Sequence, residues 1–300
     1  MFKIVRRNQV YSEWFWAYVF LAVDLAWSTL FLFYPMVKGI IFSFQDITLE
    51  NIANVHFVGF KNYIEVLTDV NGWWHSVKVS ALYTLGVVPV GVLVPFTIAL
   101  LLSNFRKSVR DFFKAAFYLP AVVSTVIYSM TLKWIFDPMH GFMNWLLENL
   151  GLPPQPWYSS ESQALFTLIL MRWISSHGFG ILLYSAALDR IPKTLYEAAE
   201  IDAASSWKKF WKITWPLLKP TTLYVTIISL IGAFQAFGGA FFITKGGPMR
   251  ATEFINYRIY REFYELGEYN IAATMSVLLM FMIVAVSALS FKIMGSEVEY

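Results

Sequence analysis

The chain has 300 residues, of which 57% are hydrophobic and only 14% are charged. Soluble domains carry about 25% charged residues, so this composition excludes a soluble protein and predicts an integral membrane protein. The net charge of +3, without a run of basic residues, gives no indication of a nucleic-acid partner. Because the chain has no cysteine, a disulfide framework and a thiolate metal site are also excluded.

Six segments are long and apolar enough to cross a bilayer as helices, since a crossing takes about 20 mostly apolar residues. Lys3, Arg6 and Arg7 precede the first segment, but its apolar run is too long for a signal peptide and no cleavage site follows. With no internal repeat and no soluble domain, we expect one all-α transmembrane domain over residues 1–300. The predicted spans cover residues 14–35, 77–102, 112–133, 163–188, 221–243 and 271–292.

The distribution of Lys and Arg predicts which side of the bilayer each loop faces. Six spans place both termini on one side, together with the loop that follows the second span and residues 189–220. That side collects fourteen Lys and Arg residues, against six on the opposite side. Because loops rich in positive charge stay inside, we expect both termini and residues 189–220 to be cytoplasmic.

Residues 189–220 form an unusually polar segment between the fourth and fifth predicted spans. Its centre reads YEAAEIDAASSWKKFWKITWPLLKP, with acids first and lysines later, an order that suits the helix dipole and predicts two short helices. From Trp207 to Thr214, apolar residues recur at i, i+3, i+4 and i+7, which predicts one apolar face. Pro216 and Pro220 then predict an end to the helical pattern before the next span.

The residues alone leave three interpretations of this segment. It could lie on the inner leaflet with its lysines toward lipid headgroups, pack under the other helices, or dock into a groove of a cytoplasmic partner. The acids and alanines of its first half favour docking, because a helix on lipid needs bulky apolar side chains.

The segment also resembles the EAA loop of ABC-importer permeases, whose pattern is E-A-A, then D-G-A, then I-x-x-P-L-x-x-P. The matching residues are Glu197, Ala198, Ala199, Asp202, Ala204, Ile213, Pro216, Leu217 and Pro220. Ala203 stands where the family usually has a turn-forming glycine. FYLPAVVSTVIYSMTLKWIFDPMHGFMNWLL, TKGGPMRATEFINYRIYREF and GEYNIAATMSVLLMFMIVAVSAL look like the carbohydrate-uptake branch, and FVGFKNYIEVL resembles the first permease of the maltose-type pair.

This resemblance implies a subunit of the bacterial inner membrane that works with a second homologous permease, two cytoplasmic ATP-binding subunits and an extracytoplasmic solute-binding protein. ATP and Mg²⁺ would be bound by the ATPase subunits. The chain lacks a G-x-x-x-x-G-K-[ST] motif, and we expect it to have no cofactor, metal or enzymatic activity of its own. The EAA loop would be the coupling helix, formed by Glu197, Ala198, Ala199, Asp202, Ala203, Ala204 and Trp207.

Polar residues inside the spans are candidates for the substrate pathway, because such groups are costly in a bilayer. Arg172, Ser176 and Phe179 are spaced i, i+4 and i+7, which predicts a shared helical face. The resemblance implies sugar contacts at Arg172, Ser176, Phe179, Ser229, Ala233 and Ala236, although several of these positions are asparagine in the maltose-type relative. The complete set of candidates adds His177 and Gln235.

Arg172 puts a cation where that relative has a neutral amide, and a guanidinium forks onto a carboxylate or phosphate. We therefore expect an acidic sugar, such as a uronate oligosaccharide or a sugar phosphate; in the alternative, Arg172 pairs with Asp24 or is structural. A secondary transporter that uses Asp24 and Arg172 as an ion-coupled pair is the second function class. A membrane enzyme is the third, but no nucleophile–base pair or H-E-x-x-H motif supports it.

Overall fold

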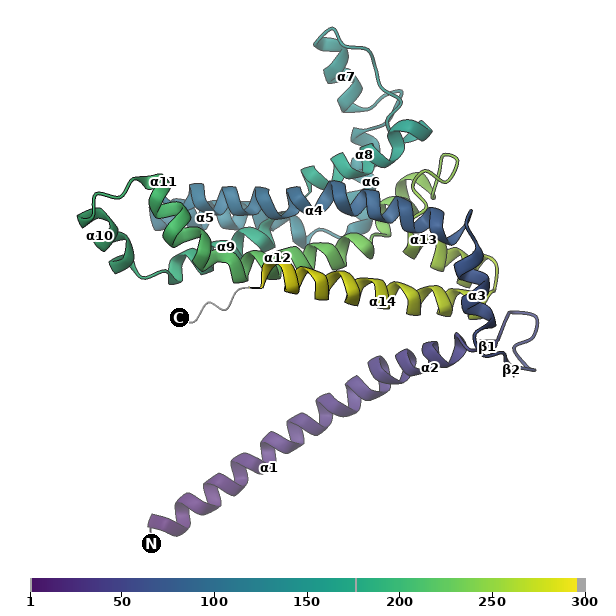
Figure 1. The fold of residues 1–300 in the computed structure, drawn as a ribbon, viewed down its shortest axis with the longest axis horizontal. Coiled ribbons are helices and arrows are strands. Elements are labelled where there is room, and N and C mark those ends of the chain that lie inside the picture. Colours follow the sequence, from purple (N-terminus) through teal and green to yellow (C-terminus); the bar gives the residue numbers. More distant parts are fainter. Residues whose placement is uncertain (1, 176, 296–300) are drawn as a thin grey trace. The chain divides into compact units, whose positions relative to one another are not determined.

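A computed structural model describes residues 2–175 and 177–295 as a mostly helical chain (Figure 1). It divides into two compact units, residues 1–68 with 262–277 and residues 69–261 with 278–300. The all-α expectation needs one addition, a two-stranded antiparallel ribbon in the first unit. The longest helix of the C-terminal region, α14 (Tyr269–Met294), belongs to both units because it runs through their boundary.

The first unit is tied together by one buried asparagine. Asn62 Nδ2 donates to the carbonyl oxygens of Ser43 (3.0 Å) and Gln45 (2.9 Å), and its Oδ1 accepts from Asn270 Nδ2 (3.2 Å). A buried amide whose donors and acceptor are used fixes the chain segments around it. Apart from α14, the elements of this unit are α1 (Phe2–Ser28), the π-helix η1 (Thr29–Phe33), α2 (Tyr34–Phe42), β1 (Gln45–Asp46), β2 (His56–Phe57), α3 (Lys61–Thr68) and the π-helix η6 (Arg261–Glu265).

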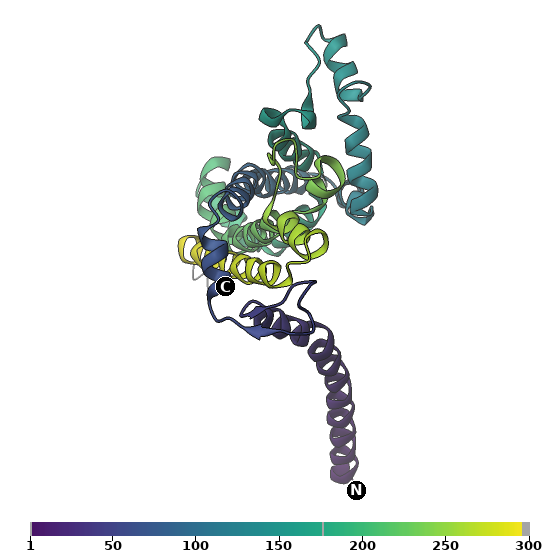
Figure 2. The same cartoon turned by 90° about the vertical axis from the view of Figure 1, so that its right-hand side faces the viewer.

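The second unit is built around α4 (Trp73–Ser103), which packs against α9 (Gly178–Arg190) and α12 (Trp215–Phe234) in the views of Figure 1 and Figure 2. Its remaining elements fill both ends of this bundle. They are α5 (Lys107–Tyr118), η2 (Leu119–Val122), α6 (Thr125–Ile135), α7 (Phe142–Asn149), η3 (Trp157–Ser159), α8 (Glu161–Ile174), α10 (Lys193–Ile201), α11 (Ser206–Lys209), η4 (Phe210–Thr214), η5 (Gly239–Thr244) and α13 (Ile255–Tyr260).

Four helices in the described residues are long and apolar enough to cross a membrane, and six if each of two bent pairs is one span. The straight candidates are Trp14–Phe42, Trp73–Ser103, Ser206–Thr244 and Tyr269–Met294. The bent pairs correspond to the predicted spans at 112–133 and 163–188. Length and hydropathy therefore located the apolar segments, but they did not reveal that these two are bent or that the fifth is interrupted after Phe234.

The predicted third span is not one helix, because the chain turns by 95° between Lys107–Val122 and Thr125–Ile135. Pro120 has no backbone N–H and cannot continue the hydrogen-bond ladder of α5. Accordingly α5 ends at Tyr118, a short 3₁₀ turn follows, and Val123 takes extended geometry before α6 begins.

The predicted fourth span is also broken, with a 46° bend between α8 and α9. The helix ends at Ile174 and Ser175 is extended, so the i, i+4, i+7 face expected for Arg172 and Phe179 does not exist. The chain satisfies the carbonyl groups freed at the break with side chains. Ser175 Oγ donates to the carbonyl of Arg172 (2.6 Å), and His177 Nε2 donates to that of Trp173 (2.9 Å).

The predicted stop at Pro216 and Pro220 is wrong, because the helix continues from Ser206 through both prolines. Pro216 lies in the first turn of α12, immediately after the π-helix η4, and the N–H of Trp215 bonds the carbonyl of Phe210 five residues back. A missing N–H is tolerated best where the hydrogen-bond ladder changes its period or begins. The predicted fifth span instead breaks at its other end, after Phe234.

The segment from Lys245 to Arg261, which we expect on the outer side of the membrane, is held by ion pairs within the second unit. Glu253 is 1% exposed and pairs with Arg250 and, at 2.7 Å, with Arg261. Arg258 pairs with Asp69 (3.2 Å), which stands just before α4. Three of the four basic residues of this segment are therefore engaged with carboxylates.

Close packing of α9 depends on positions that have no side chain. A Cβ placed on Gly178 would lie 2.5 Å from Tyr118 Cα, and one on Gly180 would lie 2.8 Å from Pro95 Cβ. Helix α9 therefore touches the backbone of α5 and the proline ring of α4 directly.

We expect Gly178→Ala to lower the free energy of unfolding by about 1–3 kcal/mol, because the new methyl group would overlap the α5 backbone. Thermal unfolding of the purified subunit in detergent measures this effect. Gly39→Ala is the matched control, since a Cβ there meets nothing within 4 Å, and its transition temperature should hold or rise. Equal transition temperatures for Gly178→Ala and the wild type would contradict the packing described.

Candidate translocation cavity and coupling loop

Helices α10 and α11 lie together at one end of α9 and α12, while α13 lies at the other end (Figure 1). Two side-chain contacts hold α10 against α11 and against η4, which follows α11 directly. Tyr196 Oη lies 2.8 Å from Thr214 Oγ1, and Lys209 Nζ donates to Glu200 Oε1 at 2.9 Å. Ser205 caps α11 by accepting the N–H of Lys208. The two short helices predicted in this segment are thus one braced unit.

The turn between them is a Schellman motif with alanine in the place usually taken by glycine. The N–H of Ala204 bonds the carbonyl of Ala199 (2.9 Å), and the N–H of Ala203 bonds that of Glu200 (3.0 Å). Ala203 has φ 52°, in the left-handed region that costs an L-residue about 1–2 kcal/mol. The departure from the family pattern therefore leaves the turn intact and adds conformational strain to it.

The predicted docking residues form an accessible surface on this unit. Glu197, Ala198, Asp202 and Ala203 are exposed, and Ala199 and Ala204 are half-buried. Ile201, between them, is 87% exposed, which is unusual for an isoleucine outside a lipid-facing helix. Ile201 was not among the predicted docking residues, although a large apolar side chain between two acids, Glu200 and Asp202, could have indicated a contact surface.

The aromatic part of the segment contacts the bundle through different residues than its spacing suggested. Phe210 and Trp215 both pack edge-on against Phe96 of α4, with ring centroids 6.2 and 5.8 Å apart. Trp207 is 71% exposed and stacks only on its neighbours Phe210 and Trp211. Phe210 and Trp215 therefore attach this segment to α4, and Trp207 belongs to the accessible surface.

A cavity of about 260 Å³ lies where the α8–α9 break faces α12. Five of the candidate pathway residues line it, from three elements of the second unit. They are Arg172, His177, Phe179, Ser229 and Ala233. The break removes the helical face proposed for these residues, yet it brings the same side chains around one space. Gly91 of α4 completes the wall opposite Ser229.

A smaller cavity of about 200 Å³ adjoins Arg172 on its other side. Arg172 lines both cavities, and its Nη1 donates to Ser175 Oγ. Tyr83 and Tyr128 line the smaller cavity with Ala236. A guanidinium bordered by tyrosine rings is a suitable surface for a sugar, because rings stack on its apolar face while the cation binds its oxygens.

The remaining candidates have different positions. Gln235 lines neither cavity, and its carbonyl oxygen accepts from Asn256 Nδ2 (2.9 Å) at the end of α12. Ser176 lies outside the described residues. Tyr83 and Tyr128 were missed, although a tyrosine inside an apolar span, away from the bilayer interface, was a signal for them.

Comparisons with known proteins define the class to which this architecture belongs. Residues 91–298 match the family described as "Binding-protein-dependent transport system inner membrane component". The chain is 33% identical to the arabinooligosaccharides transport system permease protein AraP of Bacillus subtilis, over 97% of this chain and 92% of that protein. It is 31% identical to the trehalose/maltose transport system permease protein MalF of Thermococcus litoralis, over 83% of each chain.

A solved structure of a bacterial ABC transporter involved in the import of the acidic polysaccharide alginate has the same fold. The TM-score is 0.81 at 20% identity, covering 97% of this chain and 99% of that one. A second structure, of an alginate transporter in complex with an alginate pentasaccharide-bound periplasmic protein, gives a TM-score of 0.80 at 21% identity. The chain is an inner-membrane permease subunit of the binding-protein-dependent ABC transporter family.

Replacing Ala203 by glycine should stabilise the coupling loop by about 0.5–1 kcal/mol, because glycine adopts positive φ without the Cβ penalty. Hydrogen exchange at the Ala204 amide, whose bond to Ala199 closes the turn, should slow in proportion. The opposite result is expected for Ala198→Gly, which places glycine in the interior of α10 and should speed exchange. Faster exchange in Ala203→Gly would show that the alanine carries no strain.

Proposed function

We propose that this chain is one of two permease subunits of an ATP-driven importer for a sugar or oligosaccharide. It forms half of a translocation pathway that opens alternately to the two sides of the membrane. The single observation that carries this proposal is the cavity at the α8–α9 break, where a cation, aromatic rings and a serine converge beside α12. Relatives named for arabinooligosaccharides and for trehalose and maltose support the substrate class.

An acidic sugar is the substrate that the cavity fits best. Arg172 has Ser175 as its side-chain hydrogen-bond partner, and no acidic side chain pairs with it in the described part of the chain. A cation without a counter-ion in a membrane cavity favours an anionic ligand. Relatives named for sn-glycerol-3-phosphate transport and the alginate-importing fold neighbours support the same direction.

Energy would come from two partner subunits that bind ATP and Mg²⁺, and the sugar would arrive on an extracytoplasmic binding protein. The loop formed by α10 and α11 would seat in a cleft of one ATPase. Glu197 makes no ion pair within the described chain, so its carboxylate is available to a basic residue there. The Schellman turn and the Phe96 contacts make the loop stiff enough to transmit displacement to α12.

Six crossings and cytoplasmic termini complete the proposed topology of a single transmembrane permease domain over residues 1–300, with residues 189–220 as its coupling loop. Each bent pair would then count as one span. The four basic residues of the outer segment weaken the positive-inside count, but the fourteen on the proposed cytoplasmic side outnumber them. Family membership favours an ATP-driven importer over an ion-coupled carrier based on Asp24. Asp24 lies exposed on α1.

Arg172→Gln should reduce uptake of a uronate trisaccharide by about tenfold or more and leave uptake of a neutral trisaccharide unchanged, because only the charged hydrogen bonds are lost. The assay is ATP-dependent uptake by proteoliposomes that contain both permeases, the ATPases and the binding protein. Arg172→Lys should keep part of the activity, and Lys133→Gln, which removes a cation lining neither cavity, should have no effect. Equal loss for both sugars would assign Arg172 a structural role.

A benzophenone attached at Glu197→Cys should cross-link to an ATPase subunit in inside-out vesicles. The absence of natural cysteines makes the label specific. Leu150→Cys, an exposed position after α7, is the control that should label only from the opposite side and give no ATPase adduct. ATPase adducts from position 150 alone would reverse the proposed orientation.

A further inference from the structure

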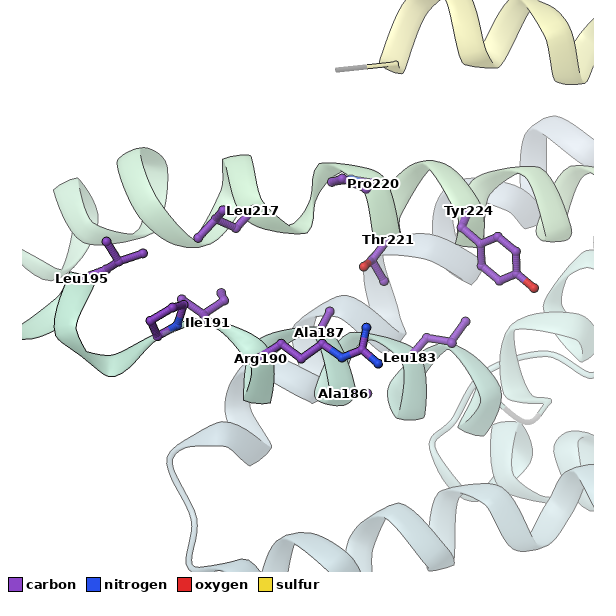
Figure 3. A pocket seen from close by; sticks show the side chains of 11 residues that line it. Leu183, Ala186, Ala187, Arg190, Ile191, Leu195, Leu217, Pro220, Thr221 and Tyr224 are labelled. Carbon is purple, nitrogen blue, oxygen red and sulfur yellow. The ribbon is translucent and has the colours of Figure 1, made fainter. Parts of the chain in front are cut away.

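A third and larger cavity, of about 600 Å³, lies between the last turns of α9 and the first turns of α12. Figure 3 shows Leu183, Ala187 and Arg190 along one wall and Thr221 and Tyr224 along the other. The space is mostly apolar, but two hydroxyl groups and one guanidinium are distributed along it. It ends where α10 begins, next to the proposed coupling loop.

This cavity continues the surface that forms the proposed sugar site. Phe179 of α9 and Ile228 of α12 line the 260 Å³ cavity. Leu183 stands one helical turn after Phe179, and Tyr224 one turn before Ile228, so both cavities are walled by the same faces of the same two helices. These four side chains, called the apolar collar below, stand between the positions of Arg172 and Arg190 along α9 and between those of Ser229 and Thr221 along α12.

Arg190 provides the 600 Å³ cavity with a cation that has no ion-pair partner in the described part of the chain. Its neighbour Asp189 is occupied elsewhere, by Arg110 (2.7 Å) and Lys114 (3.8 Å) of α5. Figure 3 shows the guanidinium end of Arg190 in the space between α9 and α12. The charge of Arg190 is therefore directed into the cavity without being neutralised there.

We propose that this cavity is the inner chamber of the translocation pathway and that Arg190 is a second binding residue for the anionic group of the transported sugar. This inference rests on the proposed import of an acidic sugar. Phe179 and Arg190 are about 16 Å apart along α9, so an anion that leaves Arg172 would cross an apolar collar before it reaches the inner end. A second weak cation site beyond the collar lowers the energy of that passage, as consecutive sites do in ion pathways.

The distribution of polar groups favours a sugar over a lipid as the occupant. An acyl chain needs a continuous apolar trench with its polar head at one end, whereas the hydroxyls of Thr221 and Tyr224 lie within this cavity. The Tyr224 ring offers a stacking surface, and the Arg190 fork fits a carboxylate.

Cysteine labelling tests the chamber without requiring the natural substrate. In vesicles carrying the complete transporter, Ala187→Cys is treated with anionic sulfonatoethyl or cationic trimethylammonioethyl methanethiosulfonate, both without nucleotide and after vanadate trapping. We expect reaction in at least one state and an anion-to-cation rate ratio that falls about threefold or more when Arg190→Gln is added. Ser103→Cys, exposed at the end of α4 and outside both the cavity and the coupling loop, should keep its ratio.

Failure of the Ala187→Cys variant to react in both states would show that lipid or protein fills the cavity, and an unchanged ratio would show that Arg190 does not set its potential. Either result overturns the inference. Uptake then tests the transport role: Arg190→Gln should slow a uronate trisaccharide about tenfold and spare a neutral one. Lys107→Gln, an exposed position at the start of α5 that lies outside the cavity and the coupling loop, should spare both. Equal uptake of the uronate by Arg190→Gln and wild type would also overturn it. If the wild type takes up no sugar, the proposed function fails, while the labelling result stands by itself.

Discussion

The interruption between α8 and α9 is the feature on which the rest of the second unit depends. A helix that continued through Ser175 would place Arg172 on one continuous helical face and close the 260 Å³ cavity. Because Ser175 and His177 supply hydrogen bonds to the carbonyls of Arg172 and Trp173, the backbone can bend inside a membrane segment without leaving those two groups unpaired. The bend also lets Gly178 approach α5 closely and directs α9 toward the proposed coupling loop.

The sequence allowed the apolar segments, the two short helices of the loop and the residues around the cavity to be predicted, but not the breaks. A hydropathy window sums over about 20 residues, so an interruption of two or three residues barely changes it. Ser175 and His177 carry the information, but a serine or histidine in a span has several uses, and only the structure shows each one bonded to a nearby carbonyl. Arg172 was therefore grouped with residues that line the same cavity, but through a helical spacing that the structure does not contain.

Prolines illustrate the same limit. Pro89 and Pro95 lie within α4 and Pro216 and Pro220 within α12, although the latter pair seemed to mark a helix end. The π-helix η4 changes the hydrogen-bond period just before Pro216, which no local propensity indicates. By contrast, the sequence did indicate that the turn at Ala203 could be strained, since a position that normally has glycine predicts positive φ. In the structure the backbone keeps this conformation, and Ala203 adopts a positive φ.

The ion pairs of the outer segment have a consequence for how the chain is inserted into the membrane. Glu253 is close in sequence to Arg250 and Arg261, but Asp69 precedes Arg258 by 189 residues. During synthesis the Arg258–Asp69 pair can form only when α4 and α13 have come together, whereas both Glu253 pairs join residues of one segment. The neutralisation of Arg258 by Asp69 therefore belongs to the folded protein and not to the chain that is being inserted. In the proposed topology the orientation thus rests on the larger number of Lys and Arg residues in the other loops, and not on the pairing of this segment.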